Sequence, residues 1–297
     1  MCQLTLSTYL MRLTRRVIGY PGRGSARMYL RSDVPEGRSR DARSACTWHA
    51  IKRRWPTGYS LLVEPTSAHA RSASWTRGLL YCGLAAGPVF VTAFLVEGAS
   101  REGYRPSRHP VSSLALGPRG WVQAANFTVT GTLVLAGAAG LWRARDPALS
   151  TRVGQALIGA AGAGLIGAAV FATDPVSGYP PGTPDALLQP SRTGIVHNLA
   201  AVPVFVGLPA AAFTFSWRSV RIGQRGFGLY CAATATTMLA TMALAGAGFD
   251  QSPRLVNVAG LFQRASIVTG FGWLAALSAR ALRAPGQDLR GEGCRGS

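Results

Sequence analysis

The sequence contains very little lysine and few acidic residues. Lys52 is the single lysine among 31 basic residues, and Asp and Glu together number 12, which gives a formal net charge of +19. Charged residues make up 14% of the chain, against about 25% in ordinary soluble domains. Hydrophobic residues reach 48%, and long stretches hold no charge at all. This pattern argues against a large soluble core and predicts an integral membrane protein.

A net charge of this size is also typical of nucleic-acid-binding proteins. Here the excess is concentrated in one segment, because residues 1–77 hold 14 Lys and Arg but only 4 Asp and Glu. Most of the remaining arginines lie in short loops between apolar segments. We therefore expect no nucleic-acid partner, and the preference for arginine fits a bacterial genome rich in G and C.

Cysteine pairs and targeting signals are absent as well. None of the 5 cysteines belongs to a CxxC motif, and Cys82 and Cys231 lie inside apolar segments. This gives no support for a disulfide framework or a metal site, and no cofactor is expected. Arg15 and Arg16 are followed by no apolar run, so a twin-arginine signal peptide is not indicated.

Three regions follow from the distribution of apolar residues. Residues 1–76 are rich in Arg, Gly, Ser and Pro and are predicted to form a disordered basic tail, or to reflect a start codon assigned too far upstream. Residues 77–282 form a six-span integral membrane domain. Residues 283–297 form a polar C-terminal tail.

Six apolar stretches are each long enough to cross a hydrocarbon core of about 30 Å. The predicted fold class is therefore all-α, a six-helix transmembrane bundle. The spans are expected near residues 78–96, 121–142, 153–173, 193–217, 226–249 and 256–282.

Arginine placement predicts the orientation of this bundle. The loops after the second and fourth spans each carry three arginines, those after the third and fifth carry one each, and both tails are basic. The positive-inside rule then places both termini in the cytoplasm of a bacterial plasma membrane protein. The segment 97–124 is the exception, because it carries four arginines on the outer side. Such an exception suggests pairing with acidic groups or with anionic lipid headgroups.

Polar residues are predicted to gather at the outer end of the bundle. The segment 97–124 supplies several of them, Asp174 follows the third span, His197 lies about one turn into the fourth, and Arg264 lies within the sixth. The candidate ligand-binding residues read from this placement are Arg105, Arg108, His109, Ser112, Asp174, His197 and Arg264.

Arg264 is the most informative of these residues. An arginine inside a span costs roughly 2.5–3.5 kcal/mol on insertion scales, so it must face the bundle interior and find a partner. Asp174 is the expected partner, with Glu97 and Asp250 as alternatives. Both a structural ion pair and a role in binding a solute or lipid remain open for this residue.

His197 and Asp174 are weak catalytic candidates, as a general acid–base pair. In the third span, Gly159, Ala163 and Gly167 recur every four residues and predict a face for helix–helix association, within the bundle or with another membrane protein.

Three segments resemble the family called domain of unknown function 998. They are GYRPSRHPVSSLALGPRGWVQAANF at 103–127, FATDP at 171–175 and TGIVHNLAA at 193–201. The resemblance covers about 77–282 and implies a prokaryotic integral membrane protein of about six spans, with no established activity. Ser113 departs from it, because an acidic residue is expected there. The resemblance singles out Tyr104, Arg105, His109, Pro110, Ser112, Asn126, Asp174 and His197.

Three functions are compatible with these features. The favoured hypothesis is a non-enzymatic protein whose outer polar cluster binds a lipid headgroup or a small solute, in transport or sensing, with membrane lipids as its partners. The alternatives are a lipid-modifying enzyme that uses Asp174 and His197, and a scaffold that associates through Gly159, Ala163 and Gly167.

Overall fold

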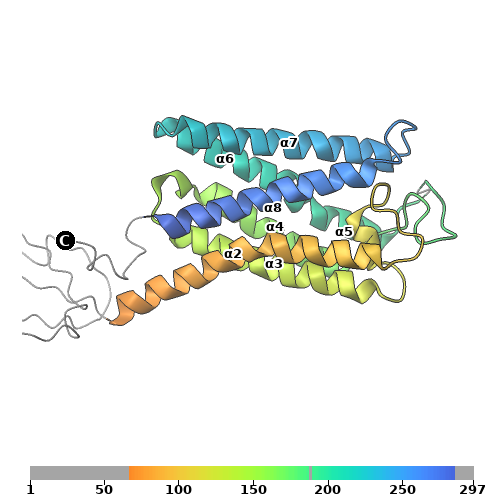
Figure 1. The fold of residues 1–297 in the computed structure, drawn as a ribbon, viewed down its shortest axis with the longest axis horizontal. Helices are drawn as coiled ribbons and strands as arrows, with labels where there is room; N and C mark the ends of the chain where they lie inside the picture. Colours follow the sequence, from red (N-terminus) through yellow and green to blue (C-terminus); the bar gives the residue numbers. More distant parts are fainter. Residues whose placement is uncertain (1–66, 187–188, 285–297) are drawn as a thin grey trace, which may run out of the picture. The chain divides into compact units, whose positions relative to one another are not determined.

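The computed structural model describes residues 67–186 and 189–284. These residues form α-helices, joined by loops in which the only β-type pairing is an isolated bridge between Val176 and Tyr179. The helices are α2 (Ser67–Ala99), α3 (Gly120–Arg143), α4 (Arg152–Val170), α5 (Arg192–Val202), α6 (Leu208–Arg221), α7 (Arg225–Phe249) and α8 (Ala259–Arg283) (Figure 1). Two 3-10 turns, η2 (Val111–Ala115) and η3 (Pro147–Leu149), lie in connections, and a π-helical segment, η4 (Pro203–Gly207), joins α5 to α6.

The prediction of six membrane-spanning helices is confirmed. Within the described range, 6 helices are long and apolar enough to cross a membrane. They are Ser74–Ala99, Gly120–Arg143, Arg152–Val170, Arg192–Arg221, Arg225–Phe249 and Ala259–Arg283. The fourth span is thus composed of α5, η4 and α6. The predicted tails before residue 67 and after residue 284 lie outside the described residues.

Local sequence signals account for several helix boundaries. The hydroxyls of Thr151 and Ser191 accept hydrogen bonds from the backbone N–H of Gly154 and Gly194, and so cap α4 and α5. α2 begins at Ser67, inside the range predicted to be a tail. α4 ends at Val170 rather than at Thr173, and α8 begins at Ala259 rather than near Val256.

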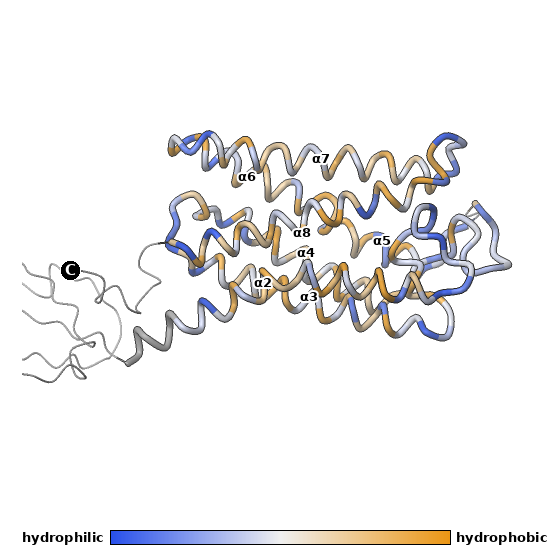
Figure 2. Tube along the Cα trace, viewed as in Figure 1, coloured by the Kyte–Doolittle hydropathy of each residue, from blue (hydrophilic) through white to orange (hydrophobic). Residues whose placement is uncertain are grey.

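The surface of the bundle is apolar between its ends. Figure 2 shows hydrophobic residues along the helices and hydrophilic residues gathered where the helices end. Trp121 and Trp142 are 70% and 47% exposed at the two ends of α3, in the places that interfacial tryptophans occupy in membrane proteins.

Glycine permits close helix contacts at the centre of the bundle. A Cβ on Gly137 of α3 would lie 2.7 Å from Cα of Gly83 in α2, and a Cβ on Gly162 of α4 would lie 2.8 Å from the carbonyl oxygen of Gly131 in α3. α4 packs against α3, α5, α6 and η4. The third span is therefore central, as its small residues predicted.

The small residues that make these contacts are not the predicted ones. Ala163 is exposed, and a Cβ on Gly159 would meet only ordinary van der Waals contact at 3.9 Å. Gly154, Gly162 and Gly164 carry the tightest contacts of α4 instead, with α6, α3 and α5 in turn. Within the bundle, Gly167 alone of the stripe Gly159, Ala163 and Gly167 makes a close contact, because a Cβ there would lie 3.0 Å from the Cβ of Ala200 in α5. The association of this stripe with another protein stays a prediction.

The connections alternate between two ends of the bundle (Figure 1). The long-loop end carries the connections 100–119, 171–191 and 250–258, and the other end carries 144–151 and 222–224. Between residues 74 and 284, Glu97, Glu102, Asp174, Asp185 and Asp250 lie at the long-loop end, and Asp146 is the single acidic residue at the other end. The acidic side chains of this region are thus concentrated where the candidate site was predicted.

Candidate functional site

A cavity of about 690 Å³ opens near the long-loop end. Residues of α5 and η4 form one wall, including Ala201, Val202 and Val206, and Met242 and Phe249 of α7 form another. Phe90, Phe127 and Leu165 contribute from α2, α3 and α4. We call this space the α5–α7 cavity. Most of its lining is apolar.

The walls of the α5–α7 cavity are separated because their helices have different neighbours. α5 packs on α4, whereas α7 packs on α6 and α8. The π-helical turn η4, which is bounded by Pro203 and followed by Pro209, contributes Val204 and Phe205 to the lining. Such π-helical turns are often found at functional sites because they displace the side chains around them.

Polar groups line one part of this cavity. They are Ser112, Thr173, Asp174, His197, Asn198, Asp250, Gln251 and Gln263. No arginine or lysine is among the lining residues. Of the candidates predicted from sequence, the structure therefore brings Ser112, Asp174 and His197 together around one space.

His197 is buried, at 3% exposure, on α5. Its Nδ1 lies 2.8 Å from the carbonyl oxygen of Phe171 and donates a hydrogen bond to it. This bond places the ring proton on Nδ1 and leaves Nε2 with a free lone pair. The ring also lies near the backbone carbonyl of Ala168. The Phe171 bond is the one hydrogen bond of normal geometry that the ring forms within the described residues, so Nε2 is the atom of His197 that can accept a hydrogen bond from a bound molecule.

Asp174 lies against the first turn of α5. Its Oδ2 accepts a hydrogen bond of 3.0 Å from the backbone N–H of Ser191. A Cβ on Gly194 would overlap the same carboxylate, so glycine is needed there for the close approach. The partial positive charge of the helix N-terminus stabilises the carboxylate in this position.

Gln263 of α8 also lines the cavity and is 6% exposed. Its Oε1 accepts a hydrogen bond of 2.8 Å from the backbone N–H of Val111 in η2. This orients the side-chain amide so that its nitrogen is the group left for the cavity. Gln263 was not among the residues predicted from the sequence, although its place beside Arg264 inside a span was a signal that could have identified it.

The hydrogen-bond pattern does not form a catalytic triad. Nδ1 of His197 is bonded to a backbone carbonyl rather than to Asp174, and within the described residues no hydrogen bond joins Ser112, Asp174 and His197. Among those residues, no group of three or more His, Cys, Asp or Glu side chains is placed to hold a metal ion.

Arg264 is buried but does not pair with Asp174, and this part of the prediction is wrong. Its guanidinium donates hydrogen bonds to the carbonyl oxygens of His109 and Gly260, at 3.1 and 3.0 Å, and to the Tyr104 hydroxyl at 2.5 Å. In the described part of the chain, Arg264 forms no ion pair with Asp174, Glu97 or Asp250. The aromatic faces of Phe94 and Tyr104 lie within 5.7 Å of the guanidinium carbon. Arg264 therefore fastens the loop 100–119 to α8, and it does not line the cavity.

Tyr104 is the phenol in this contact. Its hydroxyl donates a hydrogen bond of 3.0 Å to the carbonyl oxygen of Pro110 while it accepts from Arg264. Burial raises the pKa of the Tyr104 hydroxyl, and the neighbouring Arg264 charge opposes this effect. Tyr104 is thus a neutral link between the buried arginine and the loop.

His109 joins the two long loops. Nδ1 accepts a hydrogen bond of 2.9 Å from the backbone N–H of Arg105, and Nε2 lies 3.1 Å from the carbonyl oxygen of Ser177. The ring also contacts the rings of Tyr104 and Tyr179. Burial lowers the pKa of His109 to about 4, with the hydrogen bond to Ser177 opposing this shift and the charges of Arg108, Arg105 and Arg264 contributing to it. His109 is therefore neutral at pH 7, and it does not line the α5–α7 cavity.

This geometry predicts that stability declines in mild acid. The pKa of His109 is about 4 in the folded protein, against roughly 6.5 in an unfolded chain. The unfolded state therefore binds the proton first, and the stabilisation present above pH 6.5 is lost as the pH falls towards 4, by on the order of 1 kcal/mol per pH unit. Thermal unfolding in detergent should show this loss for the wild type and a shallower slope for His109→Gln. Parallel slopes for the two proteins would contradict it.

Arg108 and Arg105 have different surroundings. Arg108 donates to Oδ1 of Asp185 at 2.7 Å, to Oδ1 of Asn257 at 3.1 Å and to the carbonyl oxygen of Ser177 at 3.1 Å. Arg105 is exposed, and its guanidinium has no ion-pair partner in the described range. Arg108 thus ties three connections together, whereas Arg105 projects from the surface.

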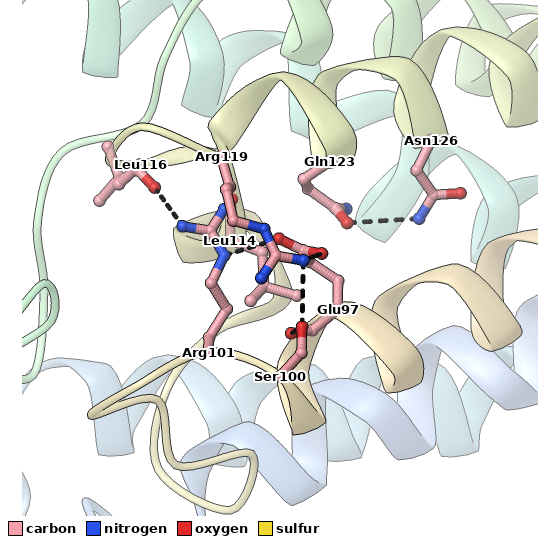
Figure 3. Close-up of polar contacts among 8 residues, drawn as sticks. All are labelled: Glu97, Ser100, Arg101, Leu114, Leu116, Arg119, Gln123 and Asn126. Carbon is pink, nitrogen blue, oxygen red and sulfur yellow. Dashed lines mark hydrogen bonds and ion pairs between the residues drawn. The ribbon is translucent and has the colours of Figure 1, made fainter.

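Two further arginines of the loop meet a buried carboxylate, as Figure 3 shows. The oxygens of Glu97 lie 2.6 Å from Nε of Arg101 and 2.8 Å from Arg119. Arg101 also donates to the carbonyl oxygens of Leu114 and Leu116. The expectation that the excess arginines pair with acidic groups is therefore confirmed for Arg101, Arg108 and Arg119.

Asn126 lies between α2 and α3 rather than in the cavity lining. Its side-chain nitrogen donates to the carbonyl oxygen of Phe90 at 3.3 Å. The same nitrogen donates to Oε1 of Gln123, also at 3.3 Å (Figure 3). Thr130 donates to its Oδ1 at 3.4 Å. Apart from the exposed Arg105, the candidates from sequence therefore separate into a cavity-lining group and a group that fastens helices and loops.

The apolar exterior and the buried polar contacts at one end define a polytopic α-helical membrane protein. A family model described as Protein of unknown function (DUF998) matches residues 84–280. The chain belongs to this family, as its motifs indicated. No curated protein and no solved structure gives a significant match to the chain.

Proposed function

We propose that this protein binds an amphiphilic molecule, with its chain in the apolar part of the α5–α7 cavity and its head at the polar part. The observation that carries the proposal is the composition of the lining. Apolar residues of six helices and η4 surround most of the 690 Å³, and the polar residues converge on one part. Cavities of this size and composition are typical of ligand-binding sites.

Access from the lipid side supports a membrane ligand. Val202 and Val206 of the cavity wall are 47% and 55% exposed, and they lie on the apolar exterior of the fourth span. A molecule that moves between α5 and α7 keeps its chain in an apolar environment throughout. Binding from the membrane therefore requires no transfer of the chain through water. Transport or sensing of such a molecule is the proposed physiological role.

Filling the cavity tests this proposal. Ala201 lines the space, and Ala201→Phe adds a ring to it. In phosphatidylcholine nanodiscs, a photoactivatable dodecanol should label peptides of α5 and α7 in the wild type, and Ala201→Phe should reduce this labelling about tenfold. Ala160→Phe is the matched control, because Ala160 is exposed on α4 and does not line the cavity. Equal labelling of all three proteins would refute the proposal.

We also propose that the long-loop end faces outward from a bacterial plasma membrane, with both termini in the cytoplasm. The opposite end of the bundle carries Arg143, Arg145, Arg152, Arg218, Arg221, Arg225, Arg280 and Arg283. With Asp146 as its single acidic residue between 74 and 284, that end fits the cytoplasmic side. A reporter fused near Gly182 should be active outside and one near Ile222 inside. The reverse pattern would overturn this orientation.

A further inference from the structure

We infer that the head of the ligand is a cationic amine, an inference that rests on the proposed binding of an amphiphile in the α5–α7 cavity. The shared chemistry is an ammonium group attached to an apolar chain. Such a molecule is either an aminolipid of the membrane or an amphiphilic amine from solution.

The formally charged side chains that line the cavity are all negative. Asp174 and Asp250 both line the cavity, and no arginine or lysine does. Neither carboxylate forms an ion pair with another described residue. Four of the seven arginines at the same end are occupied elsewhere, because Arg101 and Arg119 meet Glu97, Arg108 meets Asp185, and Arg264 meets Tyr104. The other three, Arg105, Arg192 and Arg254, do not line the cavity. An ammonium head would supply the missing positive charge.

The helix ends around the cavity also favour a positively charged ligand head. Asp250 follows the last residue of α7, and Phe249, Asp250 and Gln251 line the cavity. The C-terminus of a helix carries partial negative charge and attracts cations. The N-terminus of α5 would attract an anion, but the carboxylate of Asp174 already lies against it. A phosphate head would therefore meet two carboxylates and no arginine or lysine among the lining residues.

Two buried side chains with unpartnered polar atoms indicate a ligand independently of these acids. His197 is 3% exposed and lines the cavity, and its Nε2 is an acceptor that can receive a hydrogen bond from an ammonium N–H. Gln263 is 6% exposed, and its amide nitrogen is a donor with no partner in the described residues. This donor suits a neutral oxygen in the ligand, such as a hydroxyl or an ester carbonyl, since buried polar groups are normally hydrogen-bonded.

A series of ligands with the same chain tests this assignment. Dodecylamine, dodecanol and dodecyl phosphate compete against the photoactivatable dodecanol in phosphatidylcholine nanodiscs at pH 7, with each competitor expressed as its mole fraction in the bilayer. Dodecylamine should compete at a mole fraction at least ten times lower than that of dodecanol, and dodecyl phosphate should compete least. Equal competition by all three would overturn the assignment to an amine while leaving amphiphile binding intact. If the probe fails to label the cavity at all, both the binding of an amphiphile and the assignment to an amine are refuted.

Variants identify the groups responsible. Asp174→Asn keeps an acceptor for the Ser191 N–H, so the cap of α5 can persist in this variant. Asp250→Asn changes an exposed residue and should leave folding intact. At least one of the two variants should therefore fold and can be used for the test. Each should weaken dodecylamine competition about three- to tenfold and leave dodecanol competition unchanged. Glu102→Gln is the matched control, because Glu102 is exposed at the same end and does not line the cavity. An equal loss in Glu102→Gln would show a general surface-charge effect and would overturn the assignment.

The source of the amine is decided by a further arm of the experiment. Phosphatidylethanolamine added to the nanodiscs should compete with the probe if the ligand is a membrane aminolipid, and Asp174→Asn should remove this competition. Competition by dodecylamine alone would assign the site to amphiphilic amines from solution. Competition by phosphatidylglycerol equal to that by phosphatidylethanolamine would contradict recognition of an amine.

Discussion

Replacement of Arg264 with alanine is expected to lower the free energy of unfolding by roughly 3 kcal/mol. The guanidinium donates three hydrogen bonds from α8, to the carbonyl oxygens of His109 and Gly260 and to the Tyr104 hydroxyl. Hydrogen bonds to charged groups contribute roughly 1.5–3 kcal/mol each, and a buried acceptor left without a donor costs roughly 1–3 kcal/mol. The release of Arg264 from burial offsets part of this loss, because no carboxylate compensates its charge.

Equilibrium unfolding in mixed micelles measures the effect. Arg283→Ala is the matched control, because Arg283 is exposed in the last turn of the same helix and should change stability by less than about 0.5 kcal/mol. Tyr104→Phe removes one acceptor, and the double variant with Arg264→Ala should show a coupling of about 1 kcal/mol or more. An Arg264→Ala protein as stable as Arg283→Ala would exclude the fastening role.

Arg264 also shows what could and could not be predicted from the sequence. A charged residue inside an apolar stretch must be buried in the bundle, and that expectation is confirmed by its 9% exposure. The identity of its partners was wrong, because any backbone carbonyl or phenol can accept from an arginine and neither carries a sequence signal. Acidic residues are easier to see in a sequence, and this biased the prediction towards Asp174.

The same limit applies to helix packing. Six apolar stretches predicted six spans because chain length and hydropathy are local properties. The face that each helix buries depends on all of its neighbours. α4 contacts helices on several sides, so Gly162 and Gly164 pack tightly while Ala163 between them is exposed. A stripe of small residues indicated a central helix but not which of its faces meets which neighbour.

The division of the polar residues is the main correction to the predicted site. One cluster was expected, with a loop above Asp174 and His197 and with Arg264 below. The structure separates Tyr104, His109 and Arg264, which bond to each other or to backbone groups of the loops, from Asp174 and His197, which line the cavity. Substitutions in the first group should therefore change stability, whereas substitutions in the second should change binding.

A second large effect on stability is expected from Glu97→Gln. The Glu97 side chain is 4% exposed and the Arg101 side chain 8%, so their ion pair of 2.6 Å is buried. Removal of one charge from a buried pair leaves the other uncompensated, and such changes cost roughly 3–5 kcal/mol. Arg119 is half-exposed, so water can still solvate its guanidinium when the Glu97 charge is removed. Most of the lost stability should therefore come from the uncompensated charge of Arg101. We expect a decrease of about 3 kcal/mol in the free energy of unfolding, measured in mixed micelles.

Asp185→Asn is the matched control for this substitution. Asp185 pairs with Arg108 at the similar distance of 2.7 Å, but its side chain is 65% exposed. Exposed ion pairs contribute at most about 1 kcal/mol and are weakened further by salt. Raising the salt concentration should therefore narrow the difference between the wild type and Asp185→Asn, while the effect of Glu97→Gln should persist. If both variants lose the same stability and respond equally to salt, then burial does not strengthen the ion pair between Glu97 and Arg101. The contribution of that pair would then be no larger than that of the exposed pair between Asp185 and Arg108.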